Sequence, residues 1–388
     1  MRIVHIITTL DVGGAEMHLL AQVRGQSARG HEVRVAYLKG HGTLEADFRA
    51  AGAQVVQRVG SGPGLFVRLW PHLRWAQIVH THLLKADMAG ALAAALAGRR
   101  AGLIASKHND EQVLKRALVS RVHGVLGALP QRTICLSDHV ARFVEQHGRV
   151  RREKLVRIYY GLDPAPFERA AADPLARREA RAELGIAADE VVFICVARFA
   201  PQKAHDVLLR AHAELLRAAP RARLLLVGDD PFGDGRRRAE QLARDLALGE
   251  RVLFAGIRRD VPRLLAASDV FVMCSLWEGL GLVFLEAMSA GLPVVATRVS
   301  ATPEVVEEGA TGELVPARDA SALASAMARL AGDPQRRSAL GGRGRERVRK
   351  IFGLERMVDE TLAVYADVLA RTGVAASEIV EDRRSPGR

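Results

Sequence analysis

The N-terminal stretch Arg2-Ile-Val-His-Ile-Ile-Thr8, followed by the turn Asp11-Val-Gly13-Gly14, decides the fold class of this sequence. A short apolar, β-branched run is typical of a buried strand, and adjacent glycines permit a sharp turn. The pattern from Ala15 to Ala28 is that of a helix. A strand, a glycine turn and a helix in this order form the first half of a βαβ unit.

The same alternation continues through the first half of the chain. We expect further strands at residues 32–38, 55–59, 78–82, 103–106 and 133–136, with helices at 44–51, 84–97 and 138–147. Strands that alternate with helices indicate right-handed crossovers and a parallel sheet that is covered on both faces.

A break at Tyr159-Tyr-Gly-Leu-Asp-Pro-Ala-Pro166 separates two such patterns. Strands are expected again at 191–196, 224–227, 252–254, 270–273, 294–296 and 313–315, with a helix at 206–218. Residues 319–372 are almost entirely helical in pattern, with breaks near Gly332-Asp-Pro334 and Gly341-Gly342. We therefore expect α/β domains at 1–160 and 164–352, a loose tail at 377–388, and ligands in a cleft at the carboxyl ends of the strands.

Composition is that of a globular protein, with 49% hydrophobic and 26% charged residues. The longest apolar stretch, 86–98, contains Asp87 and is shorter than the ~20 residues that span a bilayer. The chain starts directly on a strand pattern, which predicts cytoplasmic residence. Three isolated cysteines, Cys135, Cys195 and Cys274, give no support for a disulfide framework or a cysteine metal site.

A net charge of +12 indicates an anionic partner, which could be nucleic acid, a membrane surface or a phosphorylated substrate. The excess is mostly arginine scattered along helices, and no zinc-finger or RNP-like pattern is present, so nucleic acid is not expected. The aromatic stretch from Phe66 to Trp75 is compatible with peripheral contact to an anionic membrane. Ordinary helix packing is the alternative for these aromatic residues.

The densest cluster of candidate site residues is Ser275-Leu-Trp-Glu278-Gly-Leu-Gly-Leu-Val-Phe-Leu-Glu286-Ala-Met288, which follows a strand and opens a helix. Gly279 and Gly281 let the backbone approach a ligand, and the helix start leaves N–H groups unpaired near 280–283. Such a terminus favours electron-rich groups, while carboxylates accept hydrogen bonds from sugar or ribose hydroxyls. An acidic helix start without function is the alternative.

A second cluster, Ala197-Arg198-Phe-Ala-Pro-Gln-Lys203-Ala-His205-Asp206, places two cations five residues apart in a loop after a strand. Arginine offers a planar fork and lysine a compact charge, which together suit a diphosphate that leaves with growing negative charge. Surface loop cations without a ligand are the alternative.

Three features of the first domain also follow strands. Gly13 and Gly14 precede the first helix without a GxGxxG pattern, so a phosphate or acceptor contact is favoured over a dinucleotide site. A plain tight turn is the alternative. His108 ends a strand, where it can hydrogen-bond substrate hydroxyls or exchange a proton near neutral pH. His80 and His82 share one strand face, but the sequence reveals no third ligand, so no metal site is expected.

Taken together, the chain resembles glycosyltransferase family 4, the retaining enzymes with the GT-B fold of two Rossmann-like domains that face a central cleft. The resemblance covers nearly the whole chain. It rests on Gly13-Gly14-Ala-Glu16, His108, the loop from Arg198 to Lys203, the E-x7-E spacing of Glu278 and Glu286, and Gly291-Leu-Pro-Val-Val-Ala-Thr297.

The resemblance implies a role for each matching residue. Arg198 and Lys203 would bind the donor diphosphate, and Glu286 the ribose hydroxyls. Glu278 would hold the transferred sugar. The other implied donor contacts are the backbone near Leu280, Gly281 and Leu282, the strand-end positions Gly228 and Ile257, and Gly13 and Gly14 on the phosphate and acceptor side.

The resemblance also implies that His108 lies near the outer hydroxyls of the sugar and that a last helix, roughly 354–371, packs back on the first domain. Two departures from the family pattern, Ala204 for Gly and Tyr160 for Asn, are interpreted as subfamily variation.

The expected activity is transfer of a hexose or N-acetylhexosamine from a nucleotide sugar, UDP rather than GDP, to a hydroxyl of a glycan, a lipid-linked sugar or a small glycoside. No metal and no cofactor are expected. An epimerase, a phosphorylase or a non-catalytic nucleotide-sugar-binding regulator of the same fold are the alternatives.

Overall fold

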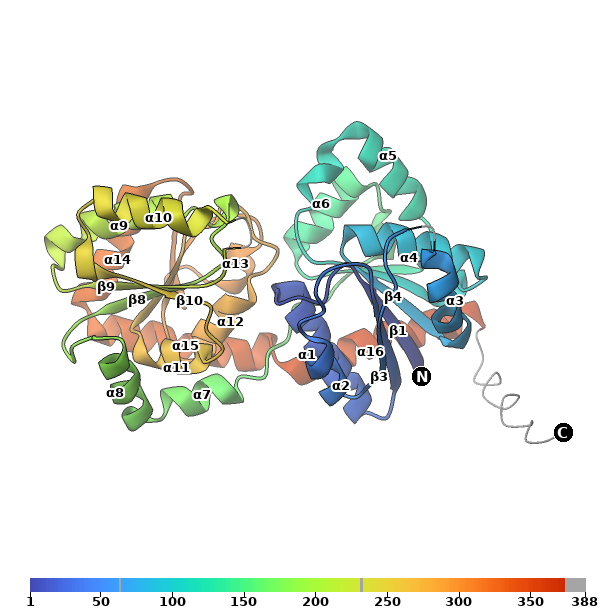
Figure 1. Cartoon of the computed structure of the whole chain (residues 1–388), viewed down its shortest axis with the longest axis horizontal. Coiled ribbons are helices and arrows are strands. Elements are labelled where there is room, and N and C mark those ends of the chain that lie inside the picture. The colour runs from blue at the N-terminus through green and yellow to red at the C-terminus, as the bar shows by residue number, and fades with distance from the viewer. Residues whose placement is uncertain (63, 231–232, 374–388) are drawn as a thin grey trace. The chain divides into compact units, whose positions relative to one another are not determined.

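The structure, a computed structural model, describes residues 1–62, 64–230 and 233–373. The tail expected at 377–388 lies outside these residues. The chain divides into two compact units (Figure 1). Unit 1 contains Met1–Gly161 and helix α16 (Leu354–Thr372), and unit 2 contains Leu162–Gly353.

Unit 1 is built on a seven-stranded sheet in which every strand pair is parallel. The order in space is β3 (Ala53–Arg58), β2 (Glu32–Tyr37), β1 (Arg2–Ile7), β4 (Ile78–His82), β5 (Leu103–Lys107), β6 (Arg132–Cys135) and β7 (Leu155–Arg157). The expected strands of the first half are present, and the three-residue edge strand β7 was not expected. The α/β fold class is confirmed.

Helices cover both faces of this sheet, and the side chains of β1 alternate between them. Ile3 packs on the face of α16, whereas Val4 and Ile6 pack against α3 and α4. The helices are α1 (Gly14–Ala28), α2 (Glu45–Ala50), α3 (Leu65–Trp75), α4 (Leu84–Leu96), α5 (Ala117–Leu126) and α6 (Asp138–Gly148). Helix α16 lies against α1 and packs Met357, Val358, Tyr365 and Val368 on the isoleucines of the central strands.

Unit 2 repeats this architecture on a six-stranded parallel sheet. The order is β10 (Val252–Gly256), β9 (Arg223–Val227), β8 (Val192–Val196), β11 (Val270–Met273), β12 (Val294–Thr297) and β13 (Gly312–Val315). Its helices are α7 (Ala165–Ala171), α8 (Pro174–Glu183), α9 (His205–Ala218), α10 (Gly235–Asp245), α11 (Val261–Ala267), α12 (Leu282–Ser289), α13 (Thr302–Val305), α14 (Ala320–Gly332) and α15 (Pro334–Ile351).

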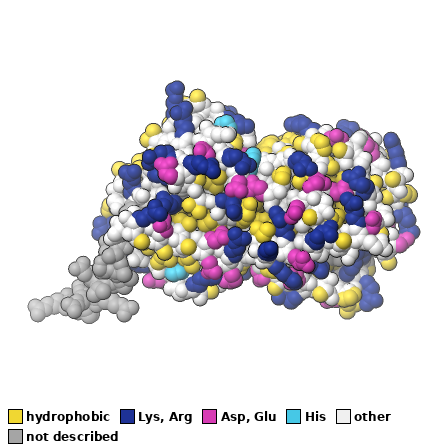
Figure 2. All heavy atoms as spheres, turned by 180° about the vertical axis from the view of Figure 1, so that it is seen from behind, with side chains coloured by type: hydrophobic (Ala, Val, Ile, Leu, Met, Phe, Trp, Pro, Cys, Tyr) yellow, Lys and Arg dark blue, Asp and Glu magenta, His cyan; other side chains and the backbone are white. Residues whose placement is uncertain are grey.

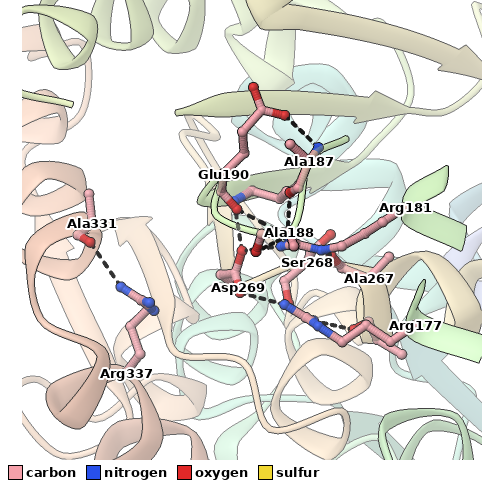
Figure 3. Close-up of polar contacts among 12 residues, drawn as sticks. Arg177, Arg181, Ala187, Ala188, Glu190, Ala267, Ser268, Asp269, Ala331 and Arg337 are labelled. Carbon is pink, nitrogen blue, oxygen red and sulfur yellow. Dashed lines mark hydrogen bonds and ion pairs between the residues drawn. The ribbon is translucent and has the colours of Figure 1, made fainter. Parts of the chain in front are cut away.

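Asp269 ties the beginning of this sheet to helix α8 (Figure 3). Its carboxylate accepts hydrogen bonds from Arg177 and Arg181, both at 2.7 Å, and from the backbone N–H of Val192 at 2.8 Å. Arg181 is buried and also donates to the carbonyl oxygens of Ala187 and Ala267. Charged hydrogen bonds of this kind hold the amino ends of β8 and β11 together and leave the opposite strand ends for chemistry.

The surface charge is spread rather than gathered. On the face drawn in Figure 2, Lys and Arg side chains are interspersed with Asp and Glu. Many arginines of the described residues pair with carboxylates, such as Arg329 with Glu313 and Arg258 with Asp260. A search of the described residues finds no helix that combines the length and the hydropathy needed to cross a membrane.

The glycine pair in α15 corrects one expectation. A helix break was predicted near Gly341-Gly342, but α15 runs through both residues without interruption. Gly341 is buried, and a Cβ atom there would lie 1.9 Å from the carbonyl oxygen of Gly291, which follows α12. Gly341 therefore serves close packing of α15 rather than a break, while Gly342 faces open space.

The two glycines make a matched pair for a stability test. Gly341→Ala should lower the free energy of unfolding by more than about 2 kcal/mol because the methyl group overlaps a backbone carbonyl that cannot move away. Gly342→Ala should raise it by about 0.5–1 kcal/mol because alanine is the better helix former. Urea unfolding of both variants measures this, and equal effects would contradict the packing described for α15.

Candidate functional site

In unit 2, the predicted site residues lie in the loops at the carboxyl ends of neighbouring strands. Arg198 and Lys203 lie between β8 and α9, and Glu278 lies between β11 and α12. Since β8 pairs with β11 on one side and with β9 on the other, these loops meet at one edge of the sheet, as does Gly228 directly after β9.

The side chains of Lys203 and Glu278 form an ion pair across these two loops. They are 13% and 7% exposed, so the pair is largely removed from water but still borders the surface. Gln202 reinforces it, because its side chain donates to the carbonyl of Trp277 and its carbonyl accepts from the backbone N–H of Leu276 at 2.7 Å. The ion pair keeps a lysine and a carboxylate poised side by side at the strand ends.

Helix α12 begins beside this pair. Its N-cap is Gly281 with φ +83°, a left-handed conformation that favours glycine, and no side chain caps the terminus. The backbone N–H groups of Leu282 and Val283 have no intrahelical acceptor, whereas that of Phe284 donates to the carbonyl of Gly281 at 3.0 Å. Together with the exposed Arg198, the terminus supplies positive potential for an anion.

Glu286 lies on the second turn of α12, and burial raises the pKa of its carboxyl group to about 7. A carboxyl group with this pKa is about half protonated at neutral pH, so it can accept one hydrogen bond and donate another. That dual capacity suits a pair of neighbouring hydroxyl groups.

Two backbone positions shape the loops. Gly228 has φ +154°, and a Cβ atom there would lie 2.0 Å from the carbonyl oxygen of Ala197, so only glycine fits beside the loop that carries Arg198. Ala204 adopts φ +47°, which an alanine reaches at a cost. The family pattern has glycine at this position, so the departure at Ala204 stores local strain. Ile257, after β10, is largely exposed.

In unit 1, the glycine turn at Gly13 lies against the side chain of Glu16. Gly13 is the N-cap of α1, and a Cβ atom on Gly13 would lie 2.5 Å from a carboxylate oxygen of Glu16. The Glu16 carboxylate accepts a hydrogen bond from Thr9 and lies at the positive end of the helix. Gly14 has open space around its Cα, so a ligand can approach the backbone there.

His108 belongs to a buried cluster of imidazoles that sequence reasoning found only in part. The parallel register pairs His5 with His80 and Ile7 with His82, so three imidazoles share one face of β1 and β4. His5, which was absent from the predicted site, is the third histidine on that face, beside His80 and His82. The sequence pattern that could have identified His5 is the period-2 spacing of the first strand. This pattern becomes informative only once the strand pairing is known.

The ligand atoms of His5, His80 and His82 lie within 4.8 Å of one another, but each ring nitrogen already has a partner. His5 Nδ1 is 2.9 Å from His82 Nε2, and His82 Nδ1 is 3.1 Å from His108 Nε2. His80 bonds the hydroxyls of Tyr365 and Ser106.

The cluster is electrically neutral at pH 7. Burial lowers the pKa of His5 to about 4 and that of His108 to about 3, with the nearby Lys107 contributing to the latter. The lowered pKa argues against proton exchange by His108 near neutral pH, which stays a prediction. Burial of an imidazole penalises its charged form, so His108 can act only as a neutral donor and acceptor.

Comparisons with known proteins give consistent matches over both units. A family model described as Glycosyltransferase Family 4 matches residues 12–166, and one described as Glycosyl transferases group 1 matches residues 176–347. The chain is 35% identical over 357 residues to the GDP-mannose-dependent alpha-(1-6)-phosphatidylinositol monomannoside mannosyltransferase of Mycolicibacterium smegmatis, covering 86% of this chain and 89% of that protein.

The chain is also 29% identical over 294 residues to the N-acetyl-alpha-D-glucosaminyl L-malate synthase of Bacillus anthracis, covering 75% of each chain. Among solved structures, Anabaena Alr3699/HepE in complex with UDP and glucose superposes with a TM-score of 0.86 at 24% identity, covering 95% of this chain and 100% of that one. That structure shares the fold.

The raised pKa of Glu286 predicts a pH-dependent stability effect. The contribution of the Glu286 carboxyl group to the free energy of unfolding is fully present at pH values below its pKa of about 4.5 in the unfolded chain. This contribution is lost as the pH rises through 7, because the folded state then holds a buried carboxylate. Glu286→Gln should therefore be more stable than the parent at pH 8 by on the order of 2 kcal/mol, with no advantage at pH 4.5. Denaturant unfolding at both pH values measures this.

Glu179, an exposed residue of α8, provides the control for that measurement. Glu179→Gln should show no pH-dependent difference in stability from the parent. Equal stabilities of Glu286→Gln and the parent at pH 8 would contradict the burial of a titrating carboxyl group on α12.

Proposed function

Because the chain belongs to glycosyltransferase family 4, we propose that it transfers a hexose or an N-acetylhexosamine from a nucleoside diphosphate sugar to a hydroxyl group of a glycan, a lipid-linked sugar or a small glycoside. The observation that carries this proposal is the Lys203–Glu278 ion pair beside the open terminus of α12. A cation and free N–H groups at one edge of a sheet suit a diphosphate, and the adjoining carboxylate suits a sugar hydroxyl.

The two cations of the β8–α9 loop stabilise the leaving group in this proposal. Negative charge grows on the diphosphate as the bond to the sugar breaks, so fixed positive groups lower the barrier. Lys203 exchanges part of its pairing with Glu278 for the phosphate oxygens, and Arg198 adds a planar fork. Glu278, with the backbone of Leu280, Gly281 and Leu282, then holds the transferred sugar.

The nucleoside lies, in this proposal, toward Glu286, Gly228 and Ile257. Glu286 grips the ribose diol, for which a half-protonated carboxyl group is suited. We favour UDP as the nucleotide, supported by the UDP complexes of Alr3699/HepE. GDP-mannose is the second candidate donor, because the mannosyltransferase of M. smegmatis is named for it.

Transfer retains the configuration at the anomeric carbon in this proposal, by departure and attack on the same face of the sugar and without a resident metal ion or cofactor. Unit 1 supplies the acceptor side through Gly13, Gly14 and His108. His108 contributes as a neutral hydrogen-bonding group.

Lys203→Ala should lower kcat/KM for donor consumption by on the order of a hundredfold or more, because the leaving diphosphate loses its fixed cation. Release of the nucleoside diphosphate from UDP-glucose, UDP-N-acetylglucosamine and GDP-mannose measures the effect. Arg210→Ala, which removes an exposed cation on α9, is the control and should leave the rate unchanged.

The outcomes of that experiment separate the proposal from its alternatives. An unchanged rate in Lys203→Ala would contradict the assigned role. A wild-type protein that binds a nucleotide sugar without any turnover would be a non-catalytic binder, and nucleotide-sugar product formed without an acceptor would indicate an epimerase.

Unit 1 also offers a surface for peripheral contact with an anionic membrane, and we place this contact on α5. Leu118, Val122 and Val125 lie at i, i+4 and i+7 on this helix and are 74%, 41% and 73% exposed. Arg116 and Arg121 are exposed beside them. An unpartnered apolar stripe flanked by cations fits the interface of an anionic bilayer.

The aromatic stretch from Phe66 to Trp75 contains both buried and exposed residues. In α3, Leu69, His72 and Leu73 are buried, and Phe66 and Trp75 pack against the same core, whereas Val67 and Trp70 are 72% and 38% exposed. Helix packing thus accounts for Phe66 and Trp75 but not for Trp70.

The double variant Leu118→Glu/Val125→Glu should reduce sedimentation with phosphatidylglycerol vesicles at low salt at least about tenfold, because it places two charges where apolar side chains enter the interface. Leu175→Glu, which changes an exposed leucine of α8 in unit 2, should leave vesicle binding unchanged. Failure of the parent protein to sediment with vesicles at low salt would overturn the membrane proposal.

A further inference from the structure

A continuous chain of hydrogen bonds runs through the interior of unit 1 from α16 to Tyr160, beside the end of the first segment of the unit at Gly161. We call it the histidine–tyrosine chain. Its members, in order, are Thr361, Gln22, Gln26, His5, His82, His108 and Tyr160. All seven side chains are buried.

The donor-to-acceptor direction of the hydrogen bonds in the histidine–tyrosine chain is set at Thr361. Its hydroxyl donates to the backbone carbonyl of Met357 at 2.8 Å, and a carbonyl can only accept. The single proton of the hydroxyl is therefore committed, so its oxygen accepts from the side-chain amide of Gln22 at 3.2 Å. The amide oxygen of Gln22 then accepts from the amide nitrogen of Gln26, also at 3.2 Å.

The same logic passes through the three imidazoles. The amide oxygen of Gln26 faces His5 Nε2 at 2.9 Å, so that nitrogen carries the proton. A neutral imidazole has one donor and one acceptor, so His5 Nδ1 accepts from His82 Nε2, and His82 Nδ1 accepts from His108 Nε2. Burial keeps the pKa of His5 and His108 at about 4 and 3, which makes these rings neutral links.

The chain ends on the phenol of Tyr160. His108 Nδ1 has to accept, so the Tyr160 hydroxyl donates its only proton to it at 2.7 Å. The remaining lone pair of that oxygen can then only accept a hydrogen bond. His18 stacks on the Tyr160 ring at 4.1 Å between centroids and holds it in place. Burial raises the pKa of the Tyr160 phenol, and the nearby Glu16 carboxylate raises it further.

We propose that Tyr160 contacts the acceptor substrate by receiving a hydrogen bond from one of its hydroxyl groups, and that the histidine–tyrosine chain is the positioning device that holds Tyr160 in this acceptor-only state. The inference rests on the proposed function. An alcohol offers the proton that Tyr160 needs without a charge, whereas a carboxylate offers only lone pairs, and both carboxylates and phosphates are repelled by Glu16. Tyr160 thus selects hydroxyl donors over anions, and its departure from the family pattern determines specificity.

A metal ion at the imidazoles would be incompatible with this arrangement. The nitrogen atoms of His5, His80 and His82 that could meet at an ion are those that carry the chain or its branch to Tyr365 and Ser106. Zinc or another transition metal found in the purified protein at one equivalent would therefore overturn the inference.

The first experiment reads the tautomers directly. In protein labelled with ¹⁵N at histidine, the two ring nitrogens give separate signals for protonated and bare states, and we expect His5, His82 and His108 to carry the proton on Nε2. An Nδ1-protonated or charged ring at any of the three positions at pH 7.5 would overturn the chain. This measurement does not depend on enzymatic activity.

Thr361→Val tests whether the distant anchor sets the direction. Without the hydroxyl, the amide of Gln22 keeps only His18 Nε2, at 3.2 Å, as a partner, and the orientation of the amide is less firmly fixed, so we expect mixed tautomers at His82 and His108. The matched control is Thr372→Val on the same helix, because the Thr372 hydroxyl makes the same bond to the carbonyl four residues earlier and takes no part in the chain. Unchanged tautomers in Thr361→Val would contradict the anchor.

The last experiment addresses the substrate contact, with methyl α-D-glucopyranoside as the hydroxyl probe and inorganic phosphate as the anionic probe. The glucoside should shift the ring signals of His108 in the parent protein, with an affinity at least about fivefold weaker in Tyr160→Phe and in Thr361→Val. Phosphate should not shift them. Absence of a glucoside shift in the parent, or an equal shift in Tyr160→Phe, would overturn the role of Tyr160.

Donor hydrolysis without an acceptor, measured in the same preparations, tests the proposed function separately. We expect the control variant Thr372→Val to hydrolyse the donor at the parental rate. No hydrolysis by the parent would refute the transferase proposal while leaving the tautomer result to decide the chain itself.

Discussion

A parallel sheet that is covered on both faces has only the ends of its strands free for chemistry, and this constraint organises both units. The side chains in the middle of each strand are buried among helices, so polar groups there must satisfy one another. The loops after the strands carry no such restriction. Lys203, Glu278 and Gly228 in unit 2 lie after their strands for this reason, as do Gly13, Gly14 and Tyr160 in unit 1.

The two units accommodate polar side chains near their sheets in different ways. Unit 2 places charges at the border of the sheet, where the Lys203–Glu278 pair stays close to water and a ligand can share it. Unit 1 buries neutral imidazoles inside the sheet face and connects them by hydrogen bonds, which avoids the cost of a buried charge. The first arrangement suits binding of an anion, and the second suits precise placement of one hydroxyl group.

Much of the architecture followed from sequence periodicity. Apolar runs located twelve of the strands to within about two residues, and the glycine turns placed the motifs after them. Strand β7 was missed because two half-buried residues and one exposed residue at a sheet edge carry almost no pattern. The break expected at Gly341 failed because glycine in a helix serves close packing as well as termination, and only the contact with Gly291 distinguishes the two.

Prediction of the site from the sequence was also limited where the site depends on tertiary contacts. The residues of unit 2 are contiguous with glycine-bearing loops, so sequence spacing was informative about them. The histidine–tyrosine chain joins residues up to 339 positions apart, as in the bond from Gln22 to Thr361, and it depends on strand register and on the packing of α16. Tyr160 consequently looked like neutral variation, although it ends that chain.

The most direct test of the account is a thermal-unfolding screen of the parent protein with UDP-glucose, UDP-N-acetylglucosamine and GDP-mannose, followed by NMR determination of the anomeric configuration of the product formed from whichever donor stabilises it. The account predicts that at least one of these nucleotide sugars raises Tm and is consumed with retention of configuration. Stabilisation by none of them, or a product of inverted configuration, would contradict it.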